Sequence, residues 1–304
     1  MKKALLFIIT VLALVSCKDE KETAAKPQAI AYHEINNEPY KKLYGYWTGM
    51  RIDDYDEVDK DTTLYAEEGA KLSLKINRII ENKVYGVSMI NGEARPVKGE
   101  MKLGSGGKKL FTLREPGTME GSGIFELVMA NDTIIGIWKA YIPKPGKVKV
   151  KKLELVQRGF KYNPDQMLSQ DDSYYVDWGT SITKDTVYTY KDGDEIKEEK
   201  EVQELYRAAS DAIFKLNGST QKLTEEQLKE LSKLDLEVLR NTIFARHGYS
   251  FKRTSLRYFF EMADWYVPVS GNVDKELTKL EKENIALLKR LEQYATDHYD
   301  YFGR

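Results

Sequence analysis

The chain has 304 residues, of which 41% are hydrophobic and 31% are charged, a composition typical of a chain that folds into two modest domains. Its 47 basic and 48 acidic residues give a formal net charge of -1, so the positive field of a nucleic-acid-binding protein is absent and we expect no such partner. The single cysteine, Cys17, excludes an intramolecular disulfide, so stability has to come from packing.

Residues 1–16 have the pattern of a bacterial signal peptide. Two lysines precede an apolar run, residues 4–15, that is too short to span a membrane comfortably. The Leu-Val-Ser-Cys sequence that ends at Cys17 resembles a lipobox, which implies cleavage before the cysteine and acylation of its thiol by palmitate or a similar chain. A short transmembrane anchor is the alternative that the length of the run disfavours. We therefore expect a lipoprotein whose Cys17 holds it on the membrane.

Residues 17–39 are polar and contain few large apolar side chains, so they are expected to form a flexible, lipidated tether. The Lys-Asp-Glu sequence at residues 18–20 resembles the basic-acidic-acidic signal that sends lipoproteins of Bacteroidota to the cell surface. The alternative is that these residues are only the charged start of the tether and carry no sorting signal. The expected location is the outer membrane or the cell surface.

Residues 40–162 have the two-residue period of β-strands. Apolar and polar side chains alternate in residues 72–76, and turn sequences rich in Gly, Pro and Asn divide the segment into about eight strands. This pattern predicts an antiparallel sheet that closes into a barrel, with a sandwich as the alternative. Trp47 in the first strand and Arg158 at the end of the last are arranged as in calycin and lipocalin barrels. That resemblance implies that the guanidinium lies over the indole.

Residues 163–220 are expected to connect two domains. Residues 176–184 and 185–191 have the composition of short strands, and Asp-Gly at residues 192–193 predicts a turn. The apolar spacing in residues 202–216 then predicts an amphipathic helix.

Residues 221–297 are predicted to form a small helical domain, followed by a tail at residues 298–304. Three Ser or Thr residues precede a Gln, Asp or Glu by three positions, the spacing of a capping box at a helix N-terminus. The three pairs are Thr224 with Gln227, Ser232 with Asp235, and Thr278 with Glu281.

The Phe-Ala-Arg-His-Gly sequence at residues 244–248 has the cationic residues and glycine that end a helix. It resembles the motif of the YARHG domain, with Phe244 in place of the family's tyrosine. The resemblance implies a small extracytoplasmic bacterial module that binds ligands and has no established reaction. It extends to residues 223–226, Trp265, Tyr266, Glu281 and Asn284.

Polar residues interrupt the apolar stripes of two predicted helices. Arg240 lies among leucines with Asn241 beside it, and Glu281 and Asn284 share a face with apolar residues of the last helix. We expect these helices to pack together with Arg240 bonded to Glu281 and both asparagines nearby.

The candidate binding residues are Trp265, Tyr266, His247 and Arg246. His247 fits a helix C-cap, and the alternative is a general base oriented by Glu281. The three histidines lack metal-ligand spacing, the acidic residues 53–61 lack the order of an EF-hand, and the glycines at residues 104–107 lack that of a phosphate loop. We therefore expect no metal, cofactor or catalytic residue.

The sequence predicts an α+β fold, with an antiparallel, calycin-like β-barrel domain followed by a small all-helical YARHG-like domain. The predicted function is that of a lipid-anchored, surface-exposed envelope protein that binds a ligand or protein partner without catalysis. The alternatives are a scaffold component of an envelope assembly and a cell-wall hydrolase that uses His247.

Overall fold

The computed structural model describes residues 39–60, 69–117, 121–170 and 181–296. Pro39–Arg304 form one compact unit. The predicted signal peptide, Cys17 and nearly all of the predicted tether lie outside the described residues. Within the described part of the chain, no helix has the length and hydropathy needed to cross a membrane.

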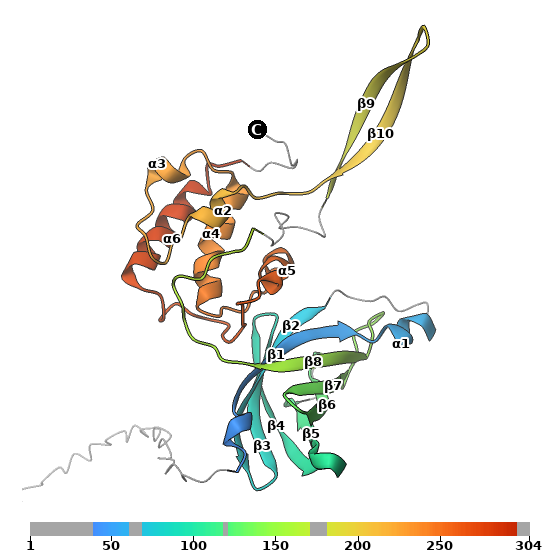
Figure 1. Cartoon of the computed structure of the whole chain (residues 1–304), viewed down its shortest axis with the longest axis vertical. Helices are drawn as coiled ribbons and strands as arrows, with labels where there is room; N and C mark the ends of the chain where they lie inside the picture. The colour runs from blue at the N-terminus through green and yellow to red at the C-terminus, as the bar shows by residue number, and fades with distance from the viewer. Residues whose placement is uncertain (1–38, 61–68, 118–120, 171–180, 297–304) are drawn as a thin grey trace, which may run out of the picture. The chain divides into compact units, whose positions relative to one another are not determined.

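Eight antiparallel strands form a closed barrel in which each strand pairs with the next and β8 pairs with β1 (Figure 1). This confirms the predicted barrel and its number of strands. Short helices lie before β1, after β1 and between β4 and β5: η1 (Lys41–Leu43), α1 (Tyr55–Lys60) and η2 (Ser105–Gly107). The strands are β1 (Gly45–Asp53), β2 (Ala70–Ile80), β3 (Lys83–Ile90), β4 (Glu93–Leu103), β5 (Lys109–Arg114), β6 (Gly123–Ala130), β7 (Thr133–Ala140) and β8 (Val150–Arg158).

Large apolar side chains fill the barrel because alternate residues of every strand point inward. Trp47 is 1% exposed, and its Nε1 donates a hydrogen bond to the carbonyl of Leu43, 2.9 Å away, which fixes η1 beside the barrel. The interior is therefore a packed core. Its largest fully buried members are Trp47, Phe111, Phe125, Leu72, Leu74, Ile76, Leu113, Ile134 and Leu155.

The predicted stacking of Arg158 on Trp47 is wrong. Arg158 is directly opposite Tyr46 in the β1–β8 pair, whereas Trp47 is opposite Gln157. Directly opposite residues of an antiparallel pair point to the same side of the sheet, and neighbours along a strand point to opposite sides. Trp47 is buried in the core, so Arg158 points outward with Tyr46.

After the barrel, β9 (Ile182–Asp192) and β10 (Glu195–Leu205) pair along their full length as a two-stranded ribbon (Figure 1). The predicted turn at residues 192–193 is confirmed, because Asp192 pairs with Glu195 and Gly193 has a φ of 65°. Nearly all side chains of the ribbon are exposed.

The predicted helix over residues 202–216 is wrong over most of its length. Val202 and Leu205 belong to β10, and only α2 (Ala212–Lys215) is helical. The apolar spacing fits a helix, but the Asp-Gly turn places the residues that follow it in register with β9. The tertiary pairing therefore overrides the helical period.

The C-terminal part contains α3 (Glu225–Leu228), α4 (Lys233–Arg246), α5 (Thr254–Met262) and α6 (Lys279–Leu291). The three predicted capping boxes are present at the N-termini of α3, α4 and α6. A second apolar core holds these helices together, and it also includes residues from the segment between the two parts. Its members include Leu168, Ala209, Ile213, Leu228, Leu236, Leu239, Ile243, Phe260, Tyr266 and Leu288.

Candidate functional site

The motif residues lie at the point where α4 ends. His247 is the C-cap, and Gly248 has a φ of 72°, the left-handed conformation that ends many helices. A Cβ on Gly248 would lie 2.5 Å from Cγ2 of Val269 and 2.8 Å from the ring of Phe160. Glycine is therefore required here both by the backbone and by the close approach of two other segments.

His247 is part of a buried polar cluster. Its Nε2 lies 2.9 Å from Oε2 of Glu281, and the phenol of Tyr162 donates to the other carboxylate oxygen at 2.9 Å. The ring of Tyr162 stacks on the imidazole with centroids 4.1 Å apart and planes 14° from parallel. His247 is 6% exposed and Glu281 0%. Tyr162 thus covers the imidazole, and a substrate reaches neither group in this conformation.

The electrostatics of the cluster favour an ionised carboxylate. Burial of Glu281 opposes ionisation, but hydrogen bonds from His247, the backbone N–H of Thr278 and Ser219 outweigh it and lower the pKa to about 2. Burial and the bond to Glu281 raise the pKa of Tyr162 to about 12. Glu281 is therefore an anionic acceptor at neutral pH, and Tyr162 remains a donor.

Arg246 points away from solvent and holds a loop segment of the chain. Its Nε donates to the carbonyl of Gln166 at 2.6 Å, and its terminal nitrogens contact Ser219 Oγ at 3.2 Å and Met167 Sδ at 3.5 Å. The side chain is largely buried, and this burial lowers its pKa to about 10. Arg246 still carries its charge at neutral pH, so its hydrogen bonds are charge-assisted.

The same segment, residues 160–168, which contains a turn at residues 164–165, is bound along its length by the helical domain. Trp265 donates from Nε1 to the carbonyl of Met167 at 2.9 Å, and Asn217 donates to the carbonyl of Pro164 at 2.9 Å. Leu168 belongs to the helical core. Phe160, Tyr162, Gln166 and Met167 of this segment also lie against residues of the helical domain. The motif therefore acts as a clasp for the chain that leaves the barrel.

The predicted pairing of Arg240 with Glu281 is wrong. Nε and Nη2 of Arg240 contact the two carboxylate oxygens of Glu292 at 2.5 and 3.0 Å. The two helices pack antiparallel, because His247 at the end of α4 meets Glu281 in the first turn of α6. Arg240 lies seven residues before His247, about 10 Å along the helix, and therefore reaches the last turn of α6 instead of the first.

The two asparagines are satisfied separately and do not form one network with Arg240. The amide of Asn284 accepts from the N–H of Leu223 at 3.0 Å and donates to the carbonyls of Gly218 and Gln221, both at 2.8 Å. Asn241 donates to the carbonyl of Glu237 at 2.8 Å within its own helix. Asn284 therefore fixes the loop before α3, and Asn241 has a local role.

The aromatic pair expected to bind a ligand makes internal contacts. Tyr266 is 2% exposed, and its hydroxyl donates to the carbonyl of Tyr249 at 2.7 Å. Its burial raises the pKa of the phenol well above its ordinary value. Trp265 is partly buried and bound to Met167. A binding role for Trp265, Tyr266, His247 and Arg246 stays a prediction.

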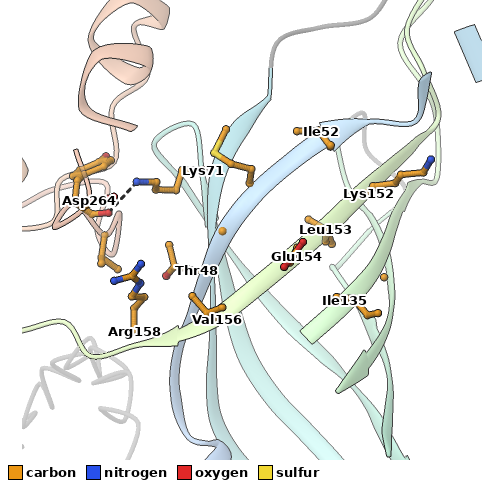
Figure 2. Close-up of a pocket in the computed structure, with 15 residues that line it drawn as sticks. Thr48, Ile52, Lys71, Ile135, Lys152, Leu153, Glu154, Val156, Arg158 and Asp264 are labelled. Atoms are coloured by element: carbon orange, nitrogen blue, oxygen red, sulfur yellow. Dashed lines mark hydrogen bonds between the residues drawn. The ribbon is translucent and has the colours of Figure 1, made fainter. Parts of the chain in front are cut away.

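The outer face of the barrel carries a groove of about 700 Å³ that Figure 2 shows in close-up. Its floor is formed by outward-facing residues of β1, β7 and β8, of which four are apolar and 37–48% exposed: Met50, Ile52, Ile135 and Val156. Lys71, Arg158 and Asp264 lie on one side of the view and Lys152 on the other. Asp264, Tyr266 and Val267 from the helical domain complete the wall. The floor of the groove is thus mixed, because Glu154 of β8 lies directly opposite Met50 and Ile135, and its rim is charged.

The acidic residues at the end of β1 and directly after it form ion pairs with β8. Asp53 is buried against Lys151, and Asp54 lies 2.8 Å from Lys152. Among the described residues, no group of three His, Cys, Asp or Glu side chains has the geometry of a metal site.

Sequence reasoning missed Tyr162, Ser219, Glu292 and the groove. The first three bind their partners across 27–119 residues, and no local pattern marks such contacts. The groove could have been predicted in part from the sequence of β1, which carries apolar residues on both faces. Met50 and Ile52 occupy positions where a half-buried strand is ordinarily polar.

The fold and the cluster define a protein with a filled antiparallel barrel and a helical domain organised around an Arg-His-Gly helix end. Residues 212–293 match the YARHG domain family, which confirms the resemblance; the match begins before residue 221, the expected start of the domain. No curated protein and no solved structure matches the chain.

Proposed function

We propose that the protein is a lipid-anchored bacterial envelope protein, exposed at the cell surface, that binds a ligand or partner without catalysis. The observation that supports binding best is the groove on the outer face of the barrel. Four exposed apolar side chains that line one groove carry a cost in water that a bound partner removes. The volume of the groove suits a compact ligand or a few side chains of a protein partner.

The burial of His247 argues for a role without catalysis. A general base has to reach the proton that it abstracts, and here Tyr162 covers the imidazole while Glu281 occupies Nε2. The motif residues bind the chain's own segment, which accounts for their chemistry. A hydrolase that uses His247 would require Tyr162 to move away from the ring.

The scaffold function is a second candidate, and the packed barrel interior favours it. A hollow barrel would offer a ligand cavity, whereas this core is filled by Trp47, Phe111 and Phe125. A partner therefore has to use the outer surface. The groove serves a ligand-binding protein and a scaffold alike, and the identity of the occupant distinguishes them.

The experiment that tests the proposal combines groove variants with crosslinking in intact cells. Ile52→Glu and Ile135→Glu each replace an exposed apolar side chain of the floor by a carboxylate. Ile142→Glu is the matched control, because Ile142 is 52% exposed, close to the 48% of Ile135, and does not line the groove. The same crosslinked species should appear with the parent and the control and be lost with both groove variants. Equal capture by all four proteins would contradict binding in the groove.

Lipid attachment is tested separately. Cys17→Ala should abolish metabolic labelling with a palmitate analogue and release the chain from the membrane fraction or leave an uncleaved precursor. A mature, membrane-bound Cys17→Ala protein would contradict the anchor. Surface exposure is tested by protease treatment of intact cells, in which a surface protein is digested and a periplasm-facing one is protected.

A further inference from the structure

The balanced net charge of the chain conceals two regions of opposite charge. Residues 182–205, which form β9, β10 and their turn, contain eight carboxylates and four lysines. We call this hairpin the acidic arm. On its face with Tyr188 and Tyr190, the carboxylates Glu199 and Glu201 are two residues apart on β10, about 7 Å by strand geometry.

The opposing region lies on the outer face of β2–β5. Ile76, Ile79, Val84, Val97 and Phe111 are buried in the barrel core, and β2 has a register shift between Ile76 and Arg78, so the residues that alternate with these buried ones on each side of the shift point outward. We call this surface the basic band. Within these four strands, the outward side chains from Lys75 to Arg114 include one carboxylate, Glu100, and six cations: Lys75, Arg78, Lys83, Lys98, Lys102 and Arg114.

The register shows why the basic band is unfavourable by itself. Lys98 is directly opposite Arg114 on β5 and directly opposite Tyr85 on β3, and Tyr85 is opposite Arg78 on β2. Like charges directly opposite each other destabilise a sheet, and Lys98 and Arg114 are both exposed. An anionic surface placed over this row would reverse the sign of the interaction.

The acidic arm is also unfavourable by itself in water. A two-stranded hairpin without a third strand or a covering surface is only marginally stable in water. Tyr188, Tyr190 and Val187 are each 43–49% exposed on it, so it has apolar surface to bury as well as charge to offset. Among the strands that the structure describes, none pairs with either edge of the arm, and such edges are surfaces that another chain can bind.

We propose that the acidic arm of one copy of the chain docks on the basic band of a second copy. Charge complementarity supports this occupant, because carboxylates of the arm would meet Lys98 and Arg114. Tyr188 and Tyr190 of the arm and Tyr85 of the band would supply aromatic faces for neighbouring cations. The same chain carries both surfaces, so the contact is heterologous and links copies head to tail. This proposal does not depend on the groove or on its ligand.

Charge reversal in both surfaces tests the proposal. The protein is the chain from residue 18 onward, which retains the whole compact unit Pro39–Arg304. The arm variant is Glu199→Lys with Glu201→Lys, and the band variant is Lys98→Glu with Arg114→Glu. The control is Lys279→Glu with Lys282→Glu, which reverses two exposed charges on α6. Sedimentation velocity over a concentration series measures association at low and high ionic strength.

The expected result is association of the parent and control at low salt that weakens steeply as salt screens the contact. The arm variant and the band variant should each associate at least about tenfold more weakly. An equimolar mixture of the two variants should recover association, because the reversed arm then meets the reversed band. Circular dichroism and thermal unfolding verify that each variant is folded.

Three outcomes would overturn the proposal. The parent could remain monomeric at every protein concentration and ionic strength. This outcome includes the case in which the arm docks on the barrel of its own chain. The two variants could associate as strongly as the parent. The mixture could fail to recover association although both variants are folded, which would assign the loss to net charge and not to contact between the two surfaces.

Discussion

His247 and Glu281 are 34 residues apart in the chain, and Nε2 of the one lies 2.9 Å from Oε2 of the other in a buried cluster. This contact joins the end of α4 to the start of α6. The same carboxylate accepts from the backbone N–H of Thr278 at 2.8 Å, so it caps its own helix while it binds the motif histidine. The charge on Glu281 thus supports a helix terminus and the contact between two helices at once.

The first prediction concerns the pH dependence of this carboxylate. The pKa of Glu281 is about 2 in the folded protein against an ordinary value of 4.5, so its stabilising effect is complete above pH 4.5 and is lost as the pH falls towards 2. Glu281→Gln should cost about 2–4 kcal/mol of unfolding free energy at pH 7, and this cost should shrink below pH 4.5. Urea unfolding at several pH values measures it.

Glu283→Gln is the control for that series, because Glu283 is on the same helix but half-exposed. It should change the free energy of unfolding by less than about 0.5 kcal/mol. A penalty for Glu281→Gln that stays constant from pH 7 to pH 3 would show that the charge of Glu281 is not what stabilises the fold.

The second prediction replaces the pairing that the sequence suggested. Arg240 and Glu292 form a bidentate contact, and their side chains are 18% and 14% exposed. A double-mutant cycle of Arg240→Ala and Glu292→Ala should give a coupling energy of about 1–3 kcal/mol. The cycle of Arg240→Ala with Glu281→Ala should be additive within about 0.5 kcal/mol. Strong coupling in the second cycle would contradict the geometry.

Local sequence patterns suffice to predict a contact where the interacting groups are close together in the chain. The capping boxes at Thr224, Ser232 and Thr278 were predictable because cap and partner are three residues apart in the chain. The barrel was predictable because alternation and turn residues recur along eight strands. In these cases the chain itself supplies the spacing between the interacting groups.

The sequence-based predictions fail where the distance between two groups depends on tertiary packing. The position of Arg240 among leucines indicates correctly that it needs a partner. The identity of that partner depends on the offset of two antiparallel helices, which neither helix encodes alone. Arg158 lies at the end of β8, as expected. Its partner on β1 is Tyr46 and not Trp47, however, and this difference of one residue places the Arg158 side chain on the opposite face of the sheet from Trp47. Periodicity also misled at residues 202–216, where a short apolar pattern fitted a helix and the structure formed a strand.

The third prediction separates two reasons for the motif glycine. Gly248 and Gly106 have nearly equal φ angles, 72° and 69°, but a Cβ would meet Val269 and Phe160 at Gly248 and nothing within 4 Å at Gly106. Gly106→Ala should cost about 1 kcal/mol through backbone strain alone. Gly248→Ala should cost at least about 2 kcal/mol more because of the steric contacts. Equal unfolding free energies for the two variants would contradict the close approach.

The fourth prediction concerns Glu261, whose Oε1 accepts from the backbone N–H of Lys71 on β2 at 2.9 Å. Burial raises the pKa of Glu261 to about 7 from its ordinary 4.5, so the folded state holds the proton more tightly and stability falls as the pH rises through this window. Glu261→Gln keeps an acceptor oxygen and removes the charge. It should therefore match the parent near pH 4.5 and be more stable by on the order of 2 kcal/mol at pH 8.

Thermal and urea unfolding across that range provide the measurement, with the exposed Glu276→Gln as the control. A variant that is less stable than the parent at pH 8 would mean that the ionised carboxylate is favourable where it lies, and that its contacts with Lys71 and Arg257 outweigh the cost of burial.

The last prediction asks whether the motif arginine acts as the clasp that the geometry describes. Arg246 donates to the carbonyl of Gln166 at 2.6 Å and contacts Met167 and Ser219, so its removal frees two positions of the segment 160–168 at once. Local opening of that segment should then require less free energy than unfolding of the domain. Arg246→Ala should raise amide hydrogen exchange in residues 160–168 by about 100-fold, equivalent to about 2.7 kcal/mol.

Arg240→Ala supplies the matched control for this experiment. It removes an arginine from the same helix and breaks a bond to Glu292 without touching residues 160–168. If Arg246 acts locally, the two variants will differ in the exchange of this segment even where their global stabilities are equal. If both raise exchange uniformly across α4, α6 and the segment, Arg246 contributes only to the common core, and the assignment of the motif as a clasp fails.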